Sequence, residues 1–332
     1  MASVGKAVSK DVKQQIRTSA LAFLSFLNKS VTPFHAVESC ESILRSAGFV
    51  ELFVNQRLKV QPKGKFYIKS EKRTSIFAFA LGGALKHRSD CPPYGGYVWR
   101  SWFDRDLSIA GRAIHLDSDR GKFEFNSEQH LRPILAQVSS DNSTKDEKKV
   151  DKDQLINGIS IVGDHHDILL KNLTGLEEEF ISGARLDNLV GTYTSIMELV
   201  QSLGDEQAFS NDQNIHLVAC FDNEEVGSVS AQGAASHFME WLMRRIVASP
   251  DEPNAFECAI GRSYLVSADQ AHACHPNYAN KHEDCHKPTF NKGVVVKINA
   301  NQRYATSAVT HSIFKIIAES AGIPIQVVAQ SD

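Results

Sequence analysis

The sequence predicts an α/β fold: a mostly parallel sheet flanked by helices, with a smaller β-rich domain inserted into it. The main evidence is an alternation in the second half of the chain. Short apolar runs typical of buried strands alternate there with longer segments whose apolar residues recur at helical spacing. Such alternation builds parallel sheets covered by helices on both faces. The chain has 332 residues, 42% of them hydrophobic, which suits one or two domains with a large core.

Each element can be placed from its local pattern. In the first half we expect helices over 10–27 and 34–47, a hairpin over 58–68, a buried strand over 75–81, and strands within the aromatic-rich stretch 97–114. In the second half we expect helices over 189–203, 234–248 and 307–321, and strands over 215–221, 263–267, 294–298 and 323–328.

Two stretches interrupt these patterns and set the predicted domain boundaries. Residues 86–93 follow neither the helical nor the strand period, and residues 139–153 form a polar, charged run typical of a flexible linker. We therefore predict a discontinuous main domain over 1–96 and 172–332. The inserted β-rich domain is predicted over 97–171.

Composition excludes several classes of protein. A net charge of −3 makes nucleic acid and an anionic membrane surface unexpected partners, and no apolar run is long enough to span a bilayer. The first 28 residues resemble an amphipathic helix more than a signal peptide. Six cysteines without a C-x-x-C pair favour reduced thiols. Together these features predict a cytoplasmic protein.

Acidic residues recur where predicted elements begin or end. Asp187 precedes a helix, Glu224 and Glu225 follow one strand, and Asp269 follows another. In a parallel sheet these ends share one edge, where ligands commonly bind. Carboxylates brought together repel one another unless a cation neutralises them. A pair of metal ions, with one glutamate left to take a proton from a bound water, would account for the set.

Two plainer interpretations stay open at this point. The acidic residues can belong to three unrelated polar loops, since strand ends are normally polar. In addition, a cluster of cysteine and histidine residues over 274–286 has the mixed composition of a zinc knuckle, although it lacks a paired C-x-x-C.

Several segments spread over nearly the whole chain match the motifs of one family. They are Thr32-Pro33-Phe34-His35-Ala36-Val37, Trp102-Phe103-Asp104-Arg105-Asp106-Leu107, Arg185-Leu186-Asp187-Asn188, Phe221-Asp222-Asn223-Glu224-Glu225-Val226-Gly227-Ser228, Ser267-Ala268-Asp269-Gln270-Ala271-His272-Ala273, His275-Pro276-Asn277-Tyr278 and Asn299-Ala300-Asn301-Gln302-Arg303-Tyr304-Ala305. On these segments the sequence resembles the aspartyl aminopeptidases, a family of dinuclear zinc metallopeptidases.

The resemblance implies a role for each acidic residue. Asp187 would bridge two divalent metal ions, zinc in the first place with manganese or cobalt as alternatives. Glu225 would bind one ion and Asp269 the other, while Glu224 would act as the general base. The substrate-binding positions implied by the resemblance are Glu224, Asp269, His272, Lys297, Tyr304 and His115, the last reaching into a neighbouring subunit. A lysine suits a substrate with an acidic side chain.

The sequence also departs from the family pattern. A His-x-Asp motif with a metal-binding histidine is replaced by the stretch 86–93, where His87 and Asp90 have a different spacing. The family's C-terminal part, with a second histidine ligand, has no counterpart, and the sequence around His115 and Gly121 is shorter. The resemblance therefore implies a carboxylate-only remnant, which suits manganese or magnesium better than zinc.

Two functions are consistent with these observations. The first is a metal-dependent aminopeptidase that releases N-terminal Asp or Glu from peptides by attack of a metal-bridging water. The alternative is a catalytically inert subunit that binds peptides or co-assembles with a full-length relative. The resemblance also implies a homo-oligomer that assembles through the inserted domain.

Overall fold

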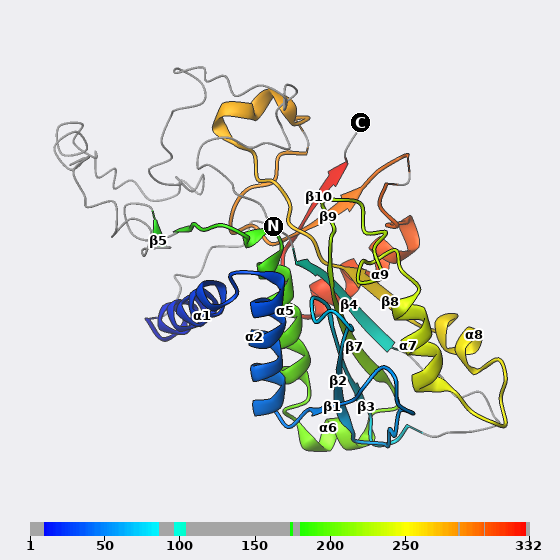
Figure 1. The fold of residues 1–332 in the computed structure, drawn as a ribbon. Helices are drawn as coiled ribbons and strands as arrows, with labels where there is room; N and C mark the ends of the chain where they lie inside the picture. Colours follow the sequence, from blue (N-terminus) through cyan, green and yellow to red (C-terminus); the bar gives the residue numbers. More distant parts are fainter. Residues whose placement is uncertain are drawn as a thin grey trace, which may run out of the picture. The chain divides into compact units, whose positions relative to one another are not determined.

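The computed structural model describes residues 10–85, 96–103, 173–174, 180–284, 286–301 and 303–329 (Figure 1). The chain divides into two compact units, and among the described residues the division falls between Asp269 and Gln270. We describe each unit separately.

The first unit is built on a six-stranded mixed sheet. Its strands are β1 (Val50–Glu51), β2 (Lys65–Lys69), β3 (Ile76–Leu81), β7 (Ile215–Asp222), β4 (Gly96–Phe103) and β8 (Tyr264–Ser267), in that spatial order. Strand β3 is antiparallel to both of its neighbours, whereas β1 with β2, β7 with β4, and β4 with β8 are parallel. The predicted α/β class is therefore confirmed.

Helices cover both faces of this sheet. Helices α1 (Lys10–Lys29), α2 (Pro33–Ser46) and α5 (Leu186–Ser202) share one apolar core with the sheet, and α7 (Phe238–Val247) shares a second core with the opposite face (Figure 1). Alternate residues of β3 supply the two cores, because successive side chains of a strand point to opposite faces. Ile76, Ala78 and Ala80 lie in the first core, and Phe77, Phe79 and Leu81 in the second.

Local sequence signals explain where several helices begin. Thr32 is the extended N-cap residue of α2, and Pro33 follows at the first helical position, where its missing N–H has no cost. The short helix α6 (Glu206–Asn211) begins after Asp205, whose carboxylate accepts hydrogen bonds from two backbone amides of the first turn. Another short helix, α8 (Ala255–Ile260), was not predicted.

Strand β4 lies in the central sheet between β7 and β8. The predicted boundary at residue 97 falls inside this strand, so these residues pair with the main sheet and not with an inserted domain. Local pattern marked them as a strand but could not identify their partners, which lie far along the chain. Residues 104–172 lie outside the described part of the chain, and the inserted domain stays a prediction.

The N-terminal hairpin also differs from the expectation. Residues 58–61 form no strand, and the hairpin joins β2 to β3 through the turn at 70–75. Helix α7 begins four residues later than predicted, because 230–236 are taken up by turns. A further two-stranded ribbon pairs β5 (Leu173–Thr174) with β6 (Phe180–Ile181).

The second unit contains a short parallel pair of strands and one long helix. Strand β9 (Val294–Ile298) pairs with β10 (Ile325–Ala329), and α9 (Ala308–Ser320) connects them, as the sequence predicted. Ser307 and Thr310 form a capping box at the start of α9. After the helix, Gly322 adopts a φ of +67°, the left-handed conformation common after helix ends. A 3₁₀ helix, η2 (Pro276–Lys281), precedes β9.

No helix in the described ranges is both long enough and apolar enough to cross a membrane.

An ion-pair cluster ties α2 to β1 and β2. The Nζ of Lys69 lies 2.7 Å from Oε2 of Glu41 and 3.0 Å from Oε1 of Glu51. Arg45 contacts Glu41 at 2.6 Å and donates to the Tyr67 hydroxyl at 2.8 Å. Burial acts to raise the pKa of Glu41, but hydrogen bonds from Lys69 and Tyr67 outweigh it, so the pKa of this carboxyl is lowered.

Replacing Phe77 by alanine tests the second core. Phe77 is fully buried, and its ring contacts Phe221 and Phe238 edge-on at centroid distances of 5.2 and 4.9 Å. We expect the free energy of unfolding in urea to fall by about 3–5 kcal/mol. The control, Ile16→Ala, changes a side chain that is 60% exposed and should shift it by less than about 0.5 kcal/mol. Similar losses in both variants would contradict the assigned core.

The Glu41 cluster predicts loss of stability in acid. A carboxyl with a lowered folded-state pKa stabilises the fold above its unfolded pKa, and this contribution disappears as the pH falls through the folded value. We expect the free energy of unfolding to decrease below about pH 5. In Glu41→Gln this decrease should be smaller, because the variant has already lost the titrating group. If the free energy of unfolding falls equally with pH in the variant and in the parent chain, Glu41 is not the group responsible.

Candidate functional site

Glu224 and Glu225 lie on a loop at the carboxyl end of β7, as predicted. The residue before them, Asn223, adopts a φ of +65°, a left-handed conformation that asparagine tolerates better than most residues. Its Oδ1 accepts hydrogen bonds from Ser230 Oγ at 2.7 Å and from Gln232 Nε2 at 2.9 Å. One amide side chain thus holds the start and the end of the loop together.

Backbone hydrogen bonds close the same loop. The amide of Gly227 donates to Glu224 O at 2.8 Å, and the amide of Asp222 donates to Gln232 O at 3.2 Å. Ser75, which is fully buried beside β3, donates from Oγ to Gln232 O at 2.7 Å. The loop is therefore fastened to the core of the sheet. It leaves Glu224 half-buried and Glu225 exposed.

Asp187 lies where α5 begins. Arg185 has a left-handed φ of +64°, and Asp187 and Asn188 have non-helical backbone angles, so the regular helix starts after them. The peptide bond between Asp187 and Asn188 is cis. Asn188 is buried, and its Nδ2 donates to Ala268 O at 2.7 Å. This hydrogen bond connects the residue after Asp187 to the residue before Asp269.

The strand register places two of the acidic loops at one edge of the sheet. Strands β7 and β8 both run parallel to β4, so their carboxyl ends point the same way. Ala219 and Ser267 both pair with Arg100 of β4 and are therefore level with each other. The loops that carry Glu224-Glu225 and Asp269 leave the sheet on this side. The sequence prediction that these strand ends share an edge agrees with the register.

In the second unit, two predicted substrate-binding residues lie together. The Nζ of Lys297, on β9, lies 5.7 Å from the centroid of the Tyr304 ring, close enough for a cation–π interaction. It also donates to Gln270 O at 2.5 Å. His272, two residues farther along the chain, is exposed. A lysine ammonium group can bind a carboxylate through charge-assisted hydrogen bonds.

The predicted ligands do not make a complete metal centre by themselves. Among the described residues, no three histidine, cysteine, aspartate or glutamate side chains lie close enough to hold one metal ion. Carboxylate oxygens suit a hard divalent cation in kind, but a structural or catalytic zinc site needs at least three protein ligands. Among the described residues, the ligands near one another are therefore fewer than a zinc centre needs.

The cysteine and histidine cluster gains no support as a zinc knuckle. Nδ1 of His286 lies 2.9 Å from Glu283, and burial lowers the pKa of His275, whose ring contacts Tyr278. These contacts are ordinary pairings within one chain segment. Cys285 lies outside the described residues.

Three other predicted residues also lie outside the described part of the chain. They are His87 and Asp90, considered as replacements for the absent His-x-Asp motif, and His115, considered as a contact to a neighbouring subunit.

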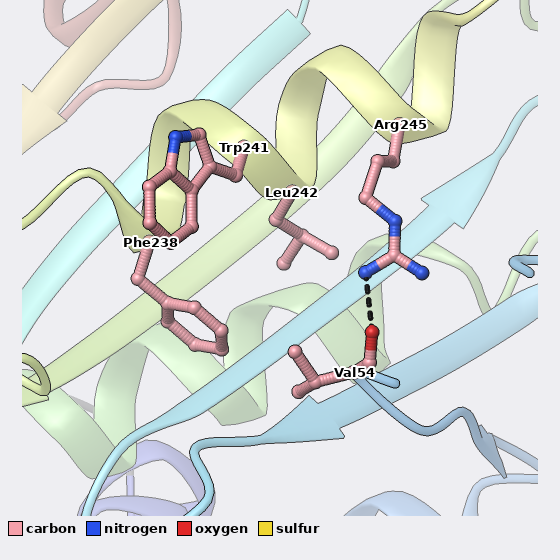
Figure 2. Close-up of a pocket in the computed structure, with 5 residues that line it drawn as sticks. All are labelled: Val54, Phe238, Trp241, Leu242 and Arg245. Carbon is pink, nitrogen blue, oxygen red and sulfur yellow. Dashed lines mark hydrogen bonds between the residues drawn. The ribbon is translucent and has the colours of Figure 1, made fainter. Parts of the chain in front are cut away.

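A pocket of ≈310 Å³ lies beside α7, and no acidic residue lines it (Figure 2). It is lined by Val54, Phe238, Trp241, Leu242 and Arg245. Arg245 Nη1 donates to Val54 O at 2.7 Å, the dashed line in Figure 2, and its second terminal nitrogen donates to Gln56 O. The pocket lining includes none of the predicted catalytic residues, so we assign no catalytic chemistry to it.

Comparison with protein families shows the family to which the chain belongs. The model of the family described as "Aminopeptidase I zinc metalloprotease (M18)" matches residues 26–92 and 112–332. The chain belongs to the M18 family. Its members are metal-dependent peptidases that remove residues from the N-terminus, which agrees with acidic residues at the carboxyl edge of an α/β sheet.

Relatives of this chain include two proteins named aspartyl aminopeptidase. The protein from Caenorhabditis elegans is 40% identical over 404 aligned positions, which cover 97% of this chain and 85% of the relative. The protein from Aspergillus oryzae is 32% identical and covers 96% and 86%, respectively. Because 404 positions exceed the 332 residues of this chain, the alignment contains gaps within it. This agrees with a chain that is shorter than this relative within the aligned region.

Solved M18 structures have the same fold. A chain in the structure of the Ape4 and Nbr1 complex matches with a TM-score of 0.68 and 27% identity, covering 98% of this chain and 77% of the other. Chaetomium thermophilum mApe1 matches with a TM-score of 0.65, 23% identity, and coverage of 94% and 86%. At that identity the second match supports the fold alone.

Substitutions at Asn223 test how the glutamate loop is held. Asn223→Gly removes the hydrogen bonds to Ser230 and Gln232, while glycine still accepts a positive φ. Asn223→Ala removes the same bonds and adds left-handed strain at φ +65°. We expect the alanine variant to unfold in urea with about 1 kcal/mol less free energy than the glycine variant. Equal stabilities would show that this φ is not enforced.

Proposed function

We propose that this chain is an aminopeptidase that releases N-terminal Asp or Glu from peptides. The observation that carries the proposal is that two acidic loops leave the same edge of the sheet. Glu224-Glu225 and Asp269 follow parallel strands of one sheet, and Asn188 donates a hydrogen bond that connects the start of α5 to the second loop. The two relatives named aspartyl aminopeptidase, at 40% and 32% identity, support the same substrate class.

The proposed role of each carboxylate is the one that the resemblance to the family implies. Asp187, Glu225 and Asp269 would supply carboxylate oxygens to the divalent metal. When bound, such a metal polarises the scissile carbonyl and lowers the pKa of water. Glu224 would accept the proton of the attacking water and pass it to the departing amine. Its half-buried position on the loop after β7 is consistent with this role.

Selectivity for acidic residues would come from the second unit. We propose that the Lys297 ammonium pairs with the side-chain carboxylate of the substrate, with Tyr304 and His272 completing the lining. The cation–π geometry between Lys297 and Tyr304 supports a shared role, because the ring faces the same ammonium group. A charged partner of this kind discriminates against apolar N-terminal residues, which would leave the lysine without its carboxylate.

Assembly and location are the remaining parts of the proposal. An M18 relative that shares the fold, yeast mApe1, is described as a dodecamer. By analogy we propose a homo-oligomer acting on peptides in the cytoplasm, with His115 reaching a neighbouring subunit. Nucleic acid is not expected as a partner, given the net charge of −3.

One observation favours a second candidate, an inert subunit that binds peptides or co-assembles with a full-length relative. The described residues provide fewer than three clustered ligands for any metal ion. Such a chain would retain the fold and the acidic loops but turn over no substrate.

Metal-dependent turnover distinguishes the two candidates. Stripped protein would be assayed with aspartyl, glutamyl and leucyl derivatives of a fluorescent amine, each with added zinc, manganese or cobalt. We expect hydrolysis of the acidic substrates only. Glu224→Gln should lower kcat by about 100-fold or more, because it removes a proton acceptor while keeping the side-chain volume. Lys297→Met should raise KM for the acidic substrates selectively.

The outcome that favours the inert subunit is equally clear. A folded preparation that hydrolyses no substrate with any of the metals, yet co-purifies with a full-length M18 relative, would replace the first proposal by the second. A chain that turns over leucyl and aspartyl substrates equally would refute the role of Lys297 but not the enzyme class.

A further inference from the structure

We propose that the pocket beside α7 binds a small organic acid that has an apolar, ring-sized body and one carboxylate. The pocket has a volume of ≈310 Å³ and is lined by residues of α7 and of the loop after β1. Such a volume is at the lower end of the range typical of small-molecule sites, about 300–1,000 Å³. None of the proposed catalytic or substrate-binding residues lines the pocket, so this site does not depend on the proposed function.

One side of α7 forms the apolar wall of the pocket. The lining residues of the helix recur at the spacing i, i+3, i+4 and i+7, which is one side of a helix. They are Phe238, Trp241, Leu242 and Arg245 (Figure 2). Leu242 is buried, whereas the large indole of Trp241 is 60% exposed. The ring of His237 stacks on this indole at a centroid distance of 6.0 Å and an interplanar angle of 18°. The stacking restrains the indole, and its exposed surface is available to an apolar ligand.

Arg245 places a positive charge at the end of this apolar wall. Its Nη1 donates to Val54 O at 2.7 Å and its second terminal nitrogen donates to Gln56 O, so the guanidinium is held against the loop (Figure 2). Both acceptors are neutral carbonyls, and no carboxylate in the described part of the chain pairs with Arg245. A guanidinium has more N–H donors than these two contacts use, so Arg245 can still donate to a carboxylate of a ligand.

The neighbouring arginine of α7 is already paired. Arg244 contacts Glu240 at 2.9 Å and Glu257 at 2.8 Å, and its guanidinium lies 4.0 Å from the centre of the Phe256 ring. Its charge is therefore compensated within the chain, and it does not line the pocket. Of the two arginines, only Arg245 can attract an anion into the pocket.

The lining favours two properties in the same ligand. The apolar wall favours a ring or a branched hydrocarbon, because such a body loses contact with water when it packs against aromatic side chains. The guanidinium favours a carboxylate, which can accept two parallel hydrogen bonds from it. A neutral apolar ligand would leave the charge of Arg245 uncompensated, and a small polar anion would leave the indole exposed.

A pair of ligands with the same shape tests the charge requirement. The probe is 3-phenylpropionate, and its neutral counterpart is 3-phenylpropanamide. Each is titrated into the ¹⁵N-labelled full chain at physiological salt, and binding is followed at the indole N–H resonance of Trp241, which is assigned by its loss in Trp241→Phe. We expect the acid to bind at least about 10-fold more tightly, because only the acid forms charge-assisted hydrogen bonds with Arg245. This comparison uses the unmodified chain, so no variant has to fold.

Arg245→Gln tests whether the preference for the acid comes from this arginine. We expect the preference to be lost while the affinity for the amide changes little. A merely structural role of Arg245, through its contacts to Val54 and Gln56, would instead weaken both ligands equally. The matched control is Arg244→Gln, which removes the same charge from the same helix. The preference should be unchanged in this control, because charges outside the pocket are screened at physiological salt.

Acid-selective binding that is lost in Arg245→Gln and kept in Arg244→Gln would support the site. Equal affinities for the acid and the amide in the parent chain, or a preference that persists in Arg245→Gln, would overturn it. The absence of any shift at the Trp241 indole resonance would do the same. A peptide that ends in phenylalanine offers the same ring and carboxylate. If it binds about 10-fold more tightly than the small acid, the pocket takes a chain terminus and the small-molecule assignment is wrong.

Discussion

The first unit depends on the complete burial of strand β3. Its side chains alternate between two apolar cores, so one strand fixes the helical layers on both faces of the sheet. Phe77 contacts an aromatic ring from β7 and another from α7, which joins three elements at one point. The burial also reaches the acidic loop, because the hydroxyl of Ser75, next to the start of β3, donates to Gln232 O. Packing in the core and placement of the glutamates are parts of the same arrangement.

Amide side chains hold the backbone in place at the carboxyl edge of the sheet. Asn223 closes the loop that carries Glu224 and Glu225, and Asn188 connects α5 to the end of β8. Both asparagines stand next to a proposed catalytic or ligand carboxylate in the sequence. Amides suit this task because they offer a donor and an acceptor without adding charge to a region that is already acidic. The carboxylates can then repel one another without losing their positions.

The elements that sequence analysis predicted well are those with a strong local pattern. Strands β7, β8 and β9 and helix α9 are marked by apolar runs and by caps such as Ser307, all readable within a few residues. The place of β4 was missed, because pairing with β7 and β8 depends on residues more than a hundred positions away. The bridge from Asn188 to Ala268 was missed for the same reason, although both residues belong to recognised motifs. Asp187, Glu224, Glu225 and Asp269 were found because polar residues at element ends are visible in the sequence itself; their roles stay predictions.

Because β4 lies between β7 and β8, neighbouring strands at this side of the sheet are far apart in the sequence. Among the described strands, β8 is bonded to the sheet only through β4, so the strand that leads to Asp269 is held by a segment that precedes it by some 160 residues. A substitution within 96–103 that displaces β4 would therefore also displace β8 and the loop after it, although the acidic residues themselves are unchanged. In evolutionary terms, a deletion on either side of this segment is tolerated only if residues 96–103 can still pair with β7 and β8.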